Sequence, residues 1–221
     1  MRKLTTILLS TMGMWLCGCV QSLNYSQGGN GATAFSPHTL AVLPVAALGN
    51  FDHDAASELI GRILPDELGK QLLAVTVSDP AIVKSQMANN EQLRDAVTKF
   101  ILTLQTTGVA DAGLSKKIGE LLHADAFVFC DVSAYGISNA YGRNFGSASI
   151  SIKIFDSASG NAVWSAGHRV DEPFMIVPPS MERLNRNLID FIISFMPQNL
   201  PSVAVRPRPK REDPFPKETH Y

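Results

Sequence analysis

Three groups of residues have the types and spacing to support chemistry. Cys17 and Cys19 lie one residue apart at the end of the apolar run "LTTILLSTMGMWLCGC", and such a pair could form a redox couple, a metal site or part of a disulfide network. Asp52-His53-Asp54 places a histidine between two carboxylates, as a metal or acid–base site would require. Cys130 lies within "FVFCDV" and would be a nucleophile only with a base beside it.

We interpret the histidines and Cys130 as structural residues. Consecutive side chains diverge in direction, and Asp52 or Asp54 would instead cap a helix that begins here. The remaining histidines, which lack the spacing of zinc sites, are His38, His123, His168 and His220. A thiol within an apolar segment is usually buried and inert, and this is the expectation for Cys130.

Motifs of common enzyme classes do not occur in the sequence. The segment "YGRNFGSAS" (141–149) contains two glycines but neither a dinucleotide-binding pattern nor a P-loop lysine. No GxSxG motif precedes a helical pattern, so serine hydrolase chemistry is not indicated. The sequence therefore predicts a protein that is not an enzyme, with no catalytic residue, no cofactor and no metal.

The residues before the paired cysteines explain them. Arg2 and Lys3 are followed by an uncharged run at 4–16, which is shorter than the about 20 residues of a membrane-spanning helix and typical of a secretory signal peptide. The end of this run, Leu16-Cys17-Gly18-Cys19, resembles the lipobox of bacterial lipoproteins, although Cys17 replaces the usual Ala, Ser, Thr or Val. The resemblance implies cleavage before Cys19 and lipidation of Cys19 with palmitate-type acyl chains. The alternative is an ordinary cleavable signal with incidental cysteines.

The lipobox resemblance also implies a location. Val20 rather than aspartate follows Cys19, which in enterobacteria-like sorting implies an outer-membrane lipoprotein that faces the periplasm. Two or more acyl chains anchor a protein stably without a spanning helix. The expected membrane contact is therefore the lipid on Cys19.

The charge balance and the cysteine count bear on two further possibilities, a nucleic-acid partner and an intramolecular disulfide. Loss of Arg2 and Lys3 reduces the 19 basic residues to 17, against 20 acidic residues. This balance argues against nucleic-acid binding, which normally requires a basic surface. With Cys17 removed and Cys19 lipidated, Cys130 has no partner for an intramolecular disulfide, so stability depends on the hydrophobic core.

Hydrophobic periodicity predicts a single α/β domain over residues 38–198. Residues 39–48 form a continuous apolar run with the length of a buried strand. A helical stripe at 55–74 contains Pro65, which should kink or split the helix. The further expected elements are a short strand at 75–80 leading into a helix, helices ending at Gly108 and at 114–124 and 179–196, and strands at 125–138, 145–156 and 161–170.

The two ends of the chain lack the pattern of a packed core. Residues 1–18 are the predicted lipoprotein signal peptide. Residues 19–37 are rich in Gly, Ser and Asn and predict a flexible tether, with an extended strand lying on the domain as the alternative. Residues 199–221 are rich in proline and charge and predict a disordered tail, either inert or a partner-docking peptide.

Several motifs in the second half resemble a known family. Ala124-Asp125-Ala126, Tyr135-Gly136 and an Asp156–Gly160 turn followed by Trp164 occur in the order found in small Gram-negative lipoproteins classed as a domain of unknown function. The module is also similar to domains of the curli-secretion channel lipoprotein, the lipoprotein activators of penicillin-binding proteins and the Tol-system periplasmic protein. The resemblance implies a single-domain mixed β-sheet packed with helices, of the anticodon-binding-like or curli-channel-lipoprotein type.

The resemblance and the anchor together lead to one hypothesis with two alternatives. The leading hypothesis is a lipid-anchored periplasmic accessory protein that binds other envelope proteins, including other lipoproteins, during envelope assembly or export. Tyr135 and Tyr141 flank a surface loop and are the candidate partner contacts. The alternatives are an oligomeric, curli-channel-like secretion component and an activator of a peptidoglycan synthase.

Overall fold

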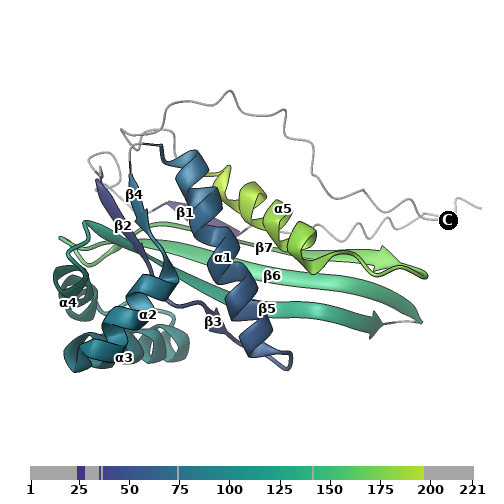
Figure 1. The fold of residues 1–221 in the computed structure, drawn as a ribbon, viewed down its shortest axis with the longest axis horizontal. Helices are drawn as coiled ribbons and strands as arrows, with labels where there is room; N and C mark the ends of the chain where they lie inside the picture. The colour runs from purple at the N-terminus through teal and green to yellow at the C-terminus, as the bar shows by residue number, and fades with distance from the viewer. Residues whose placement is uncertain (1–23, 28–34, 36, 74, 141, 197–221) are drawn as a thin grey trace, which may run out of the picture.

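The computed structural model describes residues 24–27, 35, 37–73, 75–140 and 142–196, and in this part of the chain seven strands form one mixed sheet with helices on both faces (Figure 1). The strands are β1 (Asn24–Gln27), β2 (Thr39–Val42), β3 (Ala46–Ala47), β4 (Thr76–Ser78), β5 (Ala126–Ala140), β6 (Arg143–Asp156) and β7 (Ala162–Phe174). The helices are α1 (His53–Gln71), α2 (Pro80–Asn89), α3 (Glu91–Thr107), α4 (Ala112–Leu122) and α5 (Met181–Ile193). The predicted single-domain α/β fold is confirmed.

The sheet order is β1-β7-β6-β5-β2-β4, with β3 also paired to β5. β2 pairs in parallel with β4 and with β5, and β3 also pairs in parallel with β5. The pairs β5–β6, β6–β7 and β7–β1 are antiparallel. Parallel neighbours need crossover connections, and α1 supplies the one between β2 and β4. The antiparallel strands β5, β6 and β7 are long, with 15, 14 and 13 residues.

The predicted strand over 39–48 is divided in two. β2 ends at Val42 and β3 begins at Ala46, with Pro44 between them. Proline has no N–H to donate to a ladder, so the pairing with β5 is interrupted there. The chain stays beside β5 across the break, because the Leu48 N–H donates to the Val132 carbonyl at 2.7 Å.

Helix α1 is continuous through Pro65, which was predicted to kink or split it. Asp52 is the N-cap and accepts from the Ala55 N–H at 3.0 Å. Ile60, on the N-terminal side of the proline, and Leu68, on the C-terminal side, are both fully buried. Tertiary packing on both sides therefore holds the helix together where local propensity disfavours it.

Helices cover the two faces of the sheet unequally. Helices α1 and α5 pack on one face, where alternate residues of the strands such as Val128, Cys130 and Ile152 are buried. Helices α2, α3 and α4 pack on the other face, but only near β2 and the start of β5. There the Phe100 ring of α3 makes edge contacts with Phe127 and Phe155, at centroid distances of 5.4 and 5.1 Å.

The far ends of β5, β6 and β7 extend beyond α1, α2 and α3 as a three-stranded projection (Figure 1). We call residues 133–140, 143–149 and 168–174 the blade. Among the described residues, β3 pairs with β5 only as far as Val132, and β1 pairs with β7 only over Trp164–Gly167. A β-bulge between Val132 and Ala134 shifts the register of β5 against β6 at the base of the blade.

Asp125 links the start of β5 to the start of β2. Its Oδ2 accepts from the His38 N–H at 2.7 Å and from the Thr39 N–H at 3.0 Å. The Asp125 N–H donates in return to Thr39 Oγ1 at 2.9 Å. The bond from the His38 N–H, assisted by those from Thr39, lowers the pKa of the Asp125 carboxyl. The Ala-Asp-Ala motif thus aligns two parallel strands across 86 residues of sequence.

The Asp156–Gly160 turn packs against α4. Asp156 accepts from the Ser159 N–H at 2.9 Å, as turn-forming aspartates do. Gly160 has a φ of 74°, and a Cβ there would overlap the Ala112 carbonyl at the start of α4. Gly119 of α4 likewise lies against Ser157, where a side chain would collide. Two glycines therefore permit the hairpin turn and the helix to touch.

The segments outside the domain core are described only in part. Residues 24–27, within the predicted tether, form β1 at the edge of the sheet, which corresponds to the alternative of a strand lying on the domain. The predicted signal peptide and the tail at 199–221 lie outside the described residues. Within the described ranges, no helix combines the length and hydrophobicity needed to cross a bilayer.

We expect Gly160→Ala to destabilise the domain more than Gly108→Ala. Both glycines have left-handed backbone, with φ of 74° and 71°. Alanine in this conformation therefore costs about 1–2 kcal/mol in either variant. Gly108 has open space around its Cβ position, whereas Gly160 faces the Ala112 carbonyl. The free energy of unfolding in urea should fall by about 2–4 kcal/mol for Gly160→Ala and by about 1–2 kcal/mol for the control. Equal losses would contradict the packing described for the turn.

We expect the Asp125 carboxylate to stabilise the fold in a pH-dependent manner. Its pKa is lower in the folded chain than the ordinary value of 3.8, so the unfolded chain binds the proton more readily. The stabilisation is complete above pH about 5 and is lost as the pH falls through the folded pKa. The stability difference between the wild type and Asp125→Asn should therefore shrink below pH about 4. Urea unfolding between pH 3 and 7 measures it, with Asp95→Asn on α3 as control; a difference independent of pH would refute the expectation.

Candidate interaction surface

The structure places only one of the two predicted contact tyrosines. Tyr135 lies on β5 on the helix-covered face, half-buried, with its ring 6.2 Å from that of Phe51. Burial and the nearby charge of Asp52 raise the pKa of the Tyr135 hydroxyl. Tyr141, between the ends of β5 and β6, lies outside the described residues, as does the predicted lipidation residue Cys19. Neither tyrosine contact is tested by this arrangement, and both stay predictions.

The residues considered for chemistry are dispersed in the fold. His53 lies at the start of α1, where its Nε2 contacts the Gly49 carbonyl at 2.8 Å. Cys130 is fully buried, and burial together with the charge of Asp131 raises the pKa of its thiol well above the ordinary value. In the part of the chain that the structure describes, no three His, Cys, Asp or Glu residues are placed to hold a metal ion. The geometry thus points to contact surfaces, of which two are distinctive.

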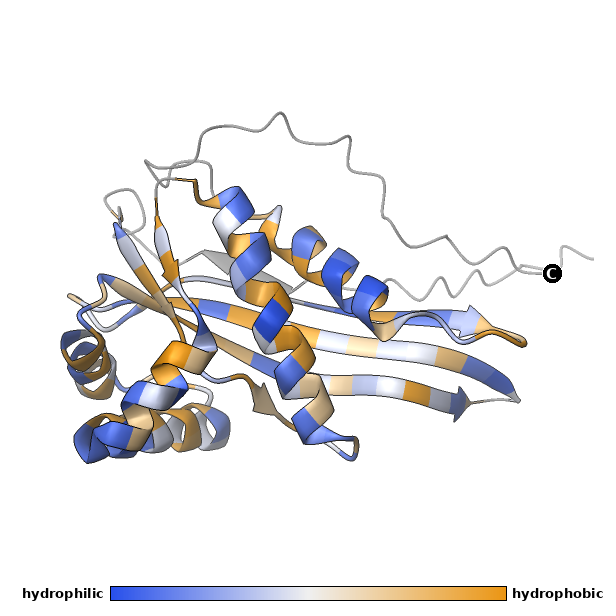
Figure 2. Ribbon diagram, in the orientation of Figure 1, coloured by the Kyte–Doolittle hydropathy of each residue, from blue (hydrophilic) through white to orange (hydrophobic). Residues whose placement is uncertain are grey.

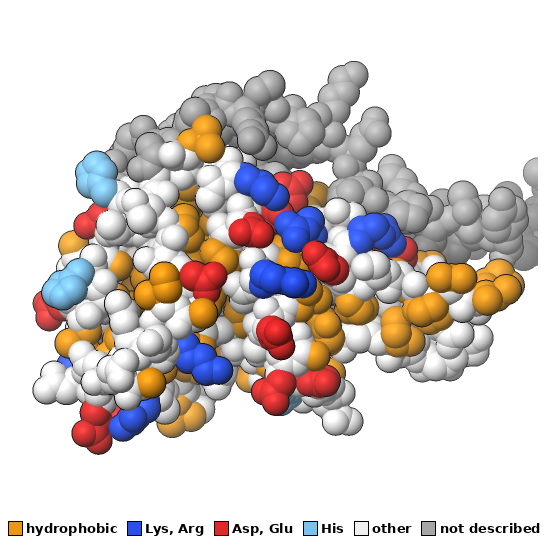
Figure 3. Space-filling view, viewed as in Figure 1, with side chains coloured by type: hydrophobic (Ala, Val, Ile, Leu, Met, Phe, Trp, Pro, Cys, Tyr) orange, Lys and Arg blue, Asp and Glu red, His pale blue; other side chains and the backbone are white. Residues whose placement is uncertain are grey.

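The first surface is an apolar loop at the tip of the blade. Residues 175–179, which we call the apical loop, connect β7 to α5. Met175, Ile176 and Val177 are 93%, 89% and 77% exposed, and Ile137 on β5 is 53% exposed. Hydrophobic side chains gather at this end of the molecule (Figure 3), and the segment between β7 and α5 is coloured as hydrophobic in Figure 2. Three adjacent apolar side chains that are almost fully exposed indicate a binding surface.

Both ends of the apical loop are fixed to the domain. Glu172, near the end of β7, pairs with Arg183 in the first turn of α5 at 2.6 Å. A Cβ at Gly146 of β6 would overlap the Pro179 ring, so this glycine lets the end of the loop lie directly on the strand. Ser180 caps α5 by accepting from the Arg183 N–H at 3.4 Å. The apical loop is therefore short, and contacts with the domain hold both of its ends in place.

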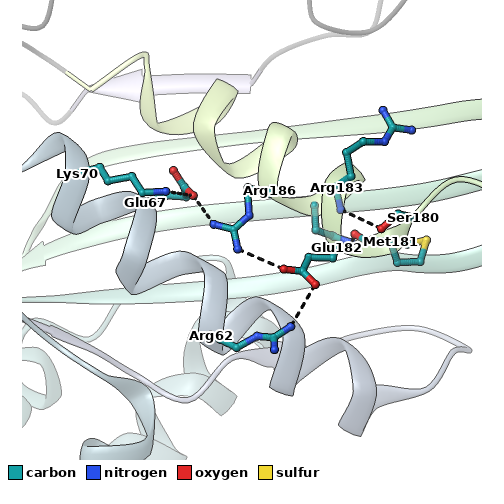
Figure 4. Close-up of polar contacts among 9 residues, drawn as sticks. Arg62, Glu67, Lys70, Ser180, Met181, Glu182, Arg183 and Arg186 are labelled. Carbon is teal, nitrogen blue, oxygen red and sulfur yellow. Dashed lines mark hydrogen bonds and ion pairs between the residues drawn. The ribbon is translucent and has the colours of Figure 1, made fainter.

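An ion-pair network holds α5, and with it the loop, on α1 (Figure 4). Glu67 of α1 is only 7% exposed, and its Oε1 accepts from Arg186 at 2.7 Å and from Lys70 at 2.8 Å. Glu182 connects Arg186, at 3.4 Å, to Arg62 of α1, at 3.5 Å. Because Glu67 is nearly buried and satisfied by two cations, its pairs should contribute more than the exposed Arg62–Glu182 pair.

The second surface is the face of β5, β6 and β7 opposite α1 and α5, beyond the phenylalanines that α3 and α4 cover. We call it the open face. Its members, read from the strand register, are Asp131, Ser149, Ser151, Lys153, Ser165, Gly167, Arg169 and Asp171. They are half-buried or exposed, and they carry both signs of charge.

Polar contacts order the open face. Arg169 donates two hydrogen bonds to Asp171, at 2.9 and 3.0 Å, and Ser147 donates a third at 2.6 Å. Partial burial opposes ionisation of Asp171, but these bonds lower its pKa, so it is charged at neutral pH. Burial raises the pKa of Asp131, although Ser151 and Lys153 oppose the shift. The resulting surface is polar, and its side chains are ordered by contacts with one another.

Sequence reasoning missed the apical loop and the α1–α5 network. The loop had a readable signal, since "PFMIVPP" at 173–179 is an uncharged apolar run between an alternating strand and a helix. The network had none, because Glu67 and Arg186 are 119 residues apart and each belongs to an ordinary amphipathic helix.

Comparison with known proteins gives similarity of fold. No protein-family model matches the sequence, and no curated protein matches it. Three similar solved structures are a PelC variant dodecamer from Paraburkholderia phytofirmans (12% identity, 82% of this chain and 98% of that chain, TM-score 0.49), lipoprotein GNA1162 from Neisseria meningitidis (18%, 71% and 96%, 0.45) and the LpoB C-terminal domain from Escherichia coli (15%, 62% and 84%, 0.34). The chain is thus similar to solved proteins that include a lipoprotein, as its motifs indicated.

We expect the Glu67–Arg186 pair to show a larger coupling energy than an exposed pair. A double-mutant cycle with Glu67→Ala and Arg186→Ala should give about 1–2 kcal/mol, because Glu67 is nearly buried. The control cycle uses Glu91 and Arg94 on α3, which are 80% and 49% exposed and should couple by at most about 0.5 kcal/mol. Urea unfolding measures the wild type, the four single variants and the two double variants. Equal coupling in the two cycles would show that the network does not hold α5 on α1.

Proposed function

We propose that this protein is a lipid-anchored accessory protein of the bacterial envelope that binds protein partners and is not an enzyme. Cys19, at the predicted lipobox, is the anchored residue, and the outer membrane is the proposed location, with the domain in the periplasm. Similarity to solved structures that include lipoprotein GNA1162 and the LpoB C-terminal domain is in keeping with an accessory role.

The open face is the observation that carries this proposal. Helices bury the other side of β5, β6 and β7, so the open face is the broad sheet surface left for a partner. Its composition suits a reversible contact, because non-obligate protein interfaces are about as polar as the rest of a protein surface. The Arg169–Asp171 salt bridge within β7 and the Ser147–Asp171 hydrogen bond between β6 and β7 hold its side chains in place, which reduces the entropy lost on binding.

Tyr135 and Tyr141 remain proposed as additional contacts. Tyr135 stands at the edge of the helix-covered face beside Phe51, with its hydroxyl in the field of Asp52. An aromatic ring with a polar tip at such an edge is a common contact residue.

Two narrower functions are alternatives within the same proposal. An oligomeric secretion component would use the open face to bind copies of the same chain. An activator of a peptidoglycan synthase would use it to bind that enzyme. Both alternatives require the anchor and the open face, and they differ in what is bound there.

Crosslinking in intact cells tests the proposal. A photoreactive residue replaces Lys153 on β6, the middle strand of the open face, or Lys99 on the exposed side of α3 as the matched control. We expect a partner crosslinked from position 153 and not from position 99, and we expect Cys19→Ser to remove both the acyl mass from the protein and the protein from the membrane fraction. Crosslinks to a second copy would favour the oligomer, and crosslinks to a synthase would favour the activator. Equal, unspecific products at both positions, or an unacylated wild type, would refute the proposal.

A further inference from the structure

We propose that the apical loop inserts into the surface of the lipid bilayer and so fixes the orientation of the anchored domain. The proposal rests on the lipid anchor at Cys19 proposed above. The binding partner that we assign to the apical loop is the lipid bilayer in which this anchor is embedded. Four observations favour a bilayer over a protein partner at this loop.

The first observation is the arrangement of the apolar side chains. Met175, Ile176 and Val177 are consecutive and each at least 77% exposed, on a loop that projects from the end of the blade. Consecutive side chains of a bent segment such as this one point in different directions. A rigid protein surface contacts such a segment from one side, whereas fluid acyl chains surround it and cover all three side chains.

The second observation is that the segment around the loop carries no charged side chain and has a reduced number of backbone N–H donors. Residues 173–179 read "PFMIVPP" and contain no charged side chain. Pro173, Pro178 and Pro179 have no backbone N–H, so three of seven residues have no donor to desolvate. Unpaired backbone N–H groups are costly in an apolar medium, and proline therefore suits a loop that enters lipid.

The third observation is the direction of β1. β1 is antiparallel to β7 with Asn24 opposite Gly167, so the N-terminal end of β1 is the end nearer Phe174 and the apical loop. Cys19 precedes Asn24 by five residues, a contour length of at most about 17 Å. From Gly167 to Met175, β7 and its continuation cover at most about 26 Å. β1 is therefore oriented with the end that is nearer to Cys19 in sequence toward the part of the molecule that bears the loop.

The fourth observation is mechanical. The Glu172–Arg183 pair, the Pro179–Gly146 contact and the Ser180 cap fix both ends of the loop. An anchored loop transmits its orientation to the sheet, whereas a loose loop would not. With the acyl chains as one attachment and the apical loop as a second, the domain would keep the open face at a defined angle to the membrane.

Depth-sensitive fluorescence quenching tests the insertion. Full-length lipidated protein carrying Ile176→Trp is reconstituted into phosphatidylethanolamine–phosphatidylglycerol vesicles that contain brominated phosphatidylcholine. We expect blue-shifted emission and strong quenching by the brominated lipid, as for a side chain about 5–10 Å below the surface. The control is Leu102→Trp on α3, where the native side chain is 59% exposed, and its emission should be unquenched. The native Trp164 is 2% exposed, and the wild type measured in parallel supplies its background.

A second measurement separates lipid from protein as the occupant. Ile176→Cys in native membranes is treated with a membrane-impermeant maleimide, with Leu102→Cys as control. Protection of position 176 in membranes together with quenching in protein-free vesicles supports insertion. Protection in membranes without quenching in vesicles shows a protein-docking loop and overturns the proposal, as does labelling equal to that of the control. Mass spectrometry of the acyl group in the same sample distinguishes failure of the anchor from failure of the loop.

Discussion

The two-residue alternation of β5 is the constraint on which the structure depends. Val128 and Cys130 point toward α1 and α5, while Phe127 and Phe129 point toward α3 and α4, so one strand takes part in both hydrophobic cores. Its two edges are also used, by β2 and β3 on one side and by β6 on the other. A slip of one residue would exchange the two sets of side chains and disrupt both cores at once. Asp125 and the Asp156–Gly160 turn fix this register at one end of the paired segment, where Ala126 lies opposite Asp156.

The prediction from sequence succeeded where a pattern reports a local cause. Helix ends are examples: Asp52, one of the two expected candidates, caps α1, and α3 ends at Gly108 as expected, because capping depends on neighbouring backbone groups. The predicted split of the helix at Pro65 is wrong, because tertiary packing competes there with local preference. Prediction from sequence could not reach contacts between distant residues, such as Glu67 with Arg186 or Asp125 with His38. For the candidate surfaces, the tyrosines were noticed because aromatic residues are conspicuous, whereas the open face emerges only once strand register is known.

The region that stabilises the domain and the region that exposes surface for contacts lie at different ends of the sheet. Near β2 and the start of β5 the sheet is covered on both sides, and this region buries most of the large side chains. The blade has helices on one side only, and its middle strand β6 pairs with β5 on one edge and with β7 on the other. Because few core contacts depend on the blade, its surface residues and the apical loop can vary in sequence with little cost to folding. A small domain thereby carries a polar sheet face and an apolar tip on one rigid extension.

The bulge between Val132 and Ala134 has an evolutionary consequence. It adds one residue to β5, so that Tyr135 lies opposite Ala148 on the helix-covered face, whereas unbroken alternation would direct it to the open face. If Ser133 were instead paired directly with Ser149, without the bulge, the outer half of β5 would be inverted and its inner half left untouched. Tyr135 would then face outward, and Ala134 would turn inward. Gain or loss of a bulge at one position can thus replace the outer surface of the strand in a single step, which gives such domains a simple route to new partners without rebuilding their cores.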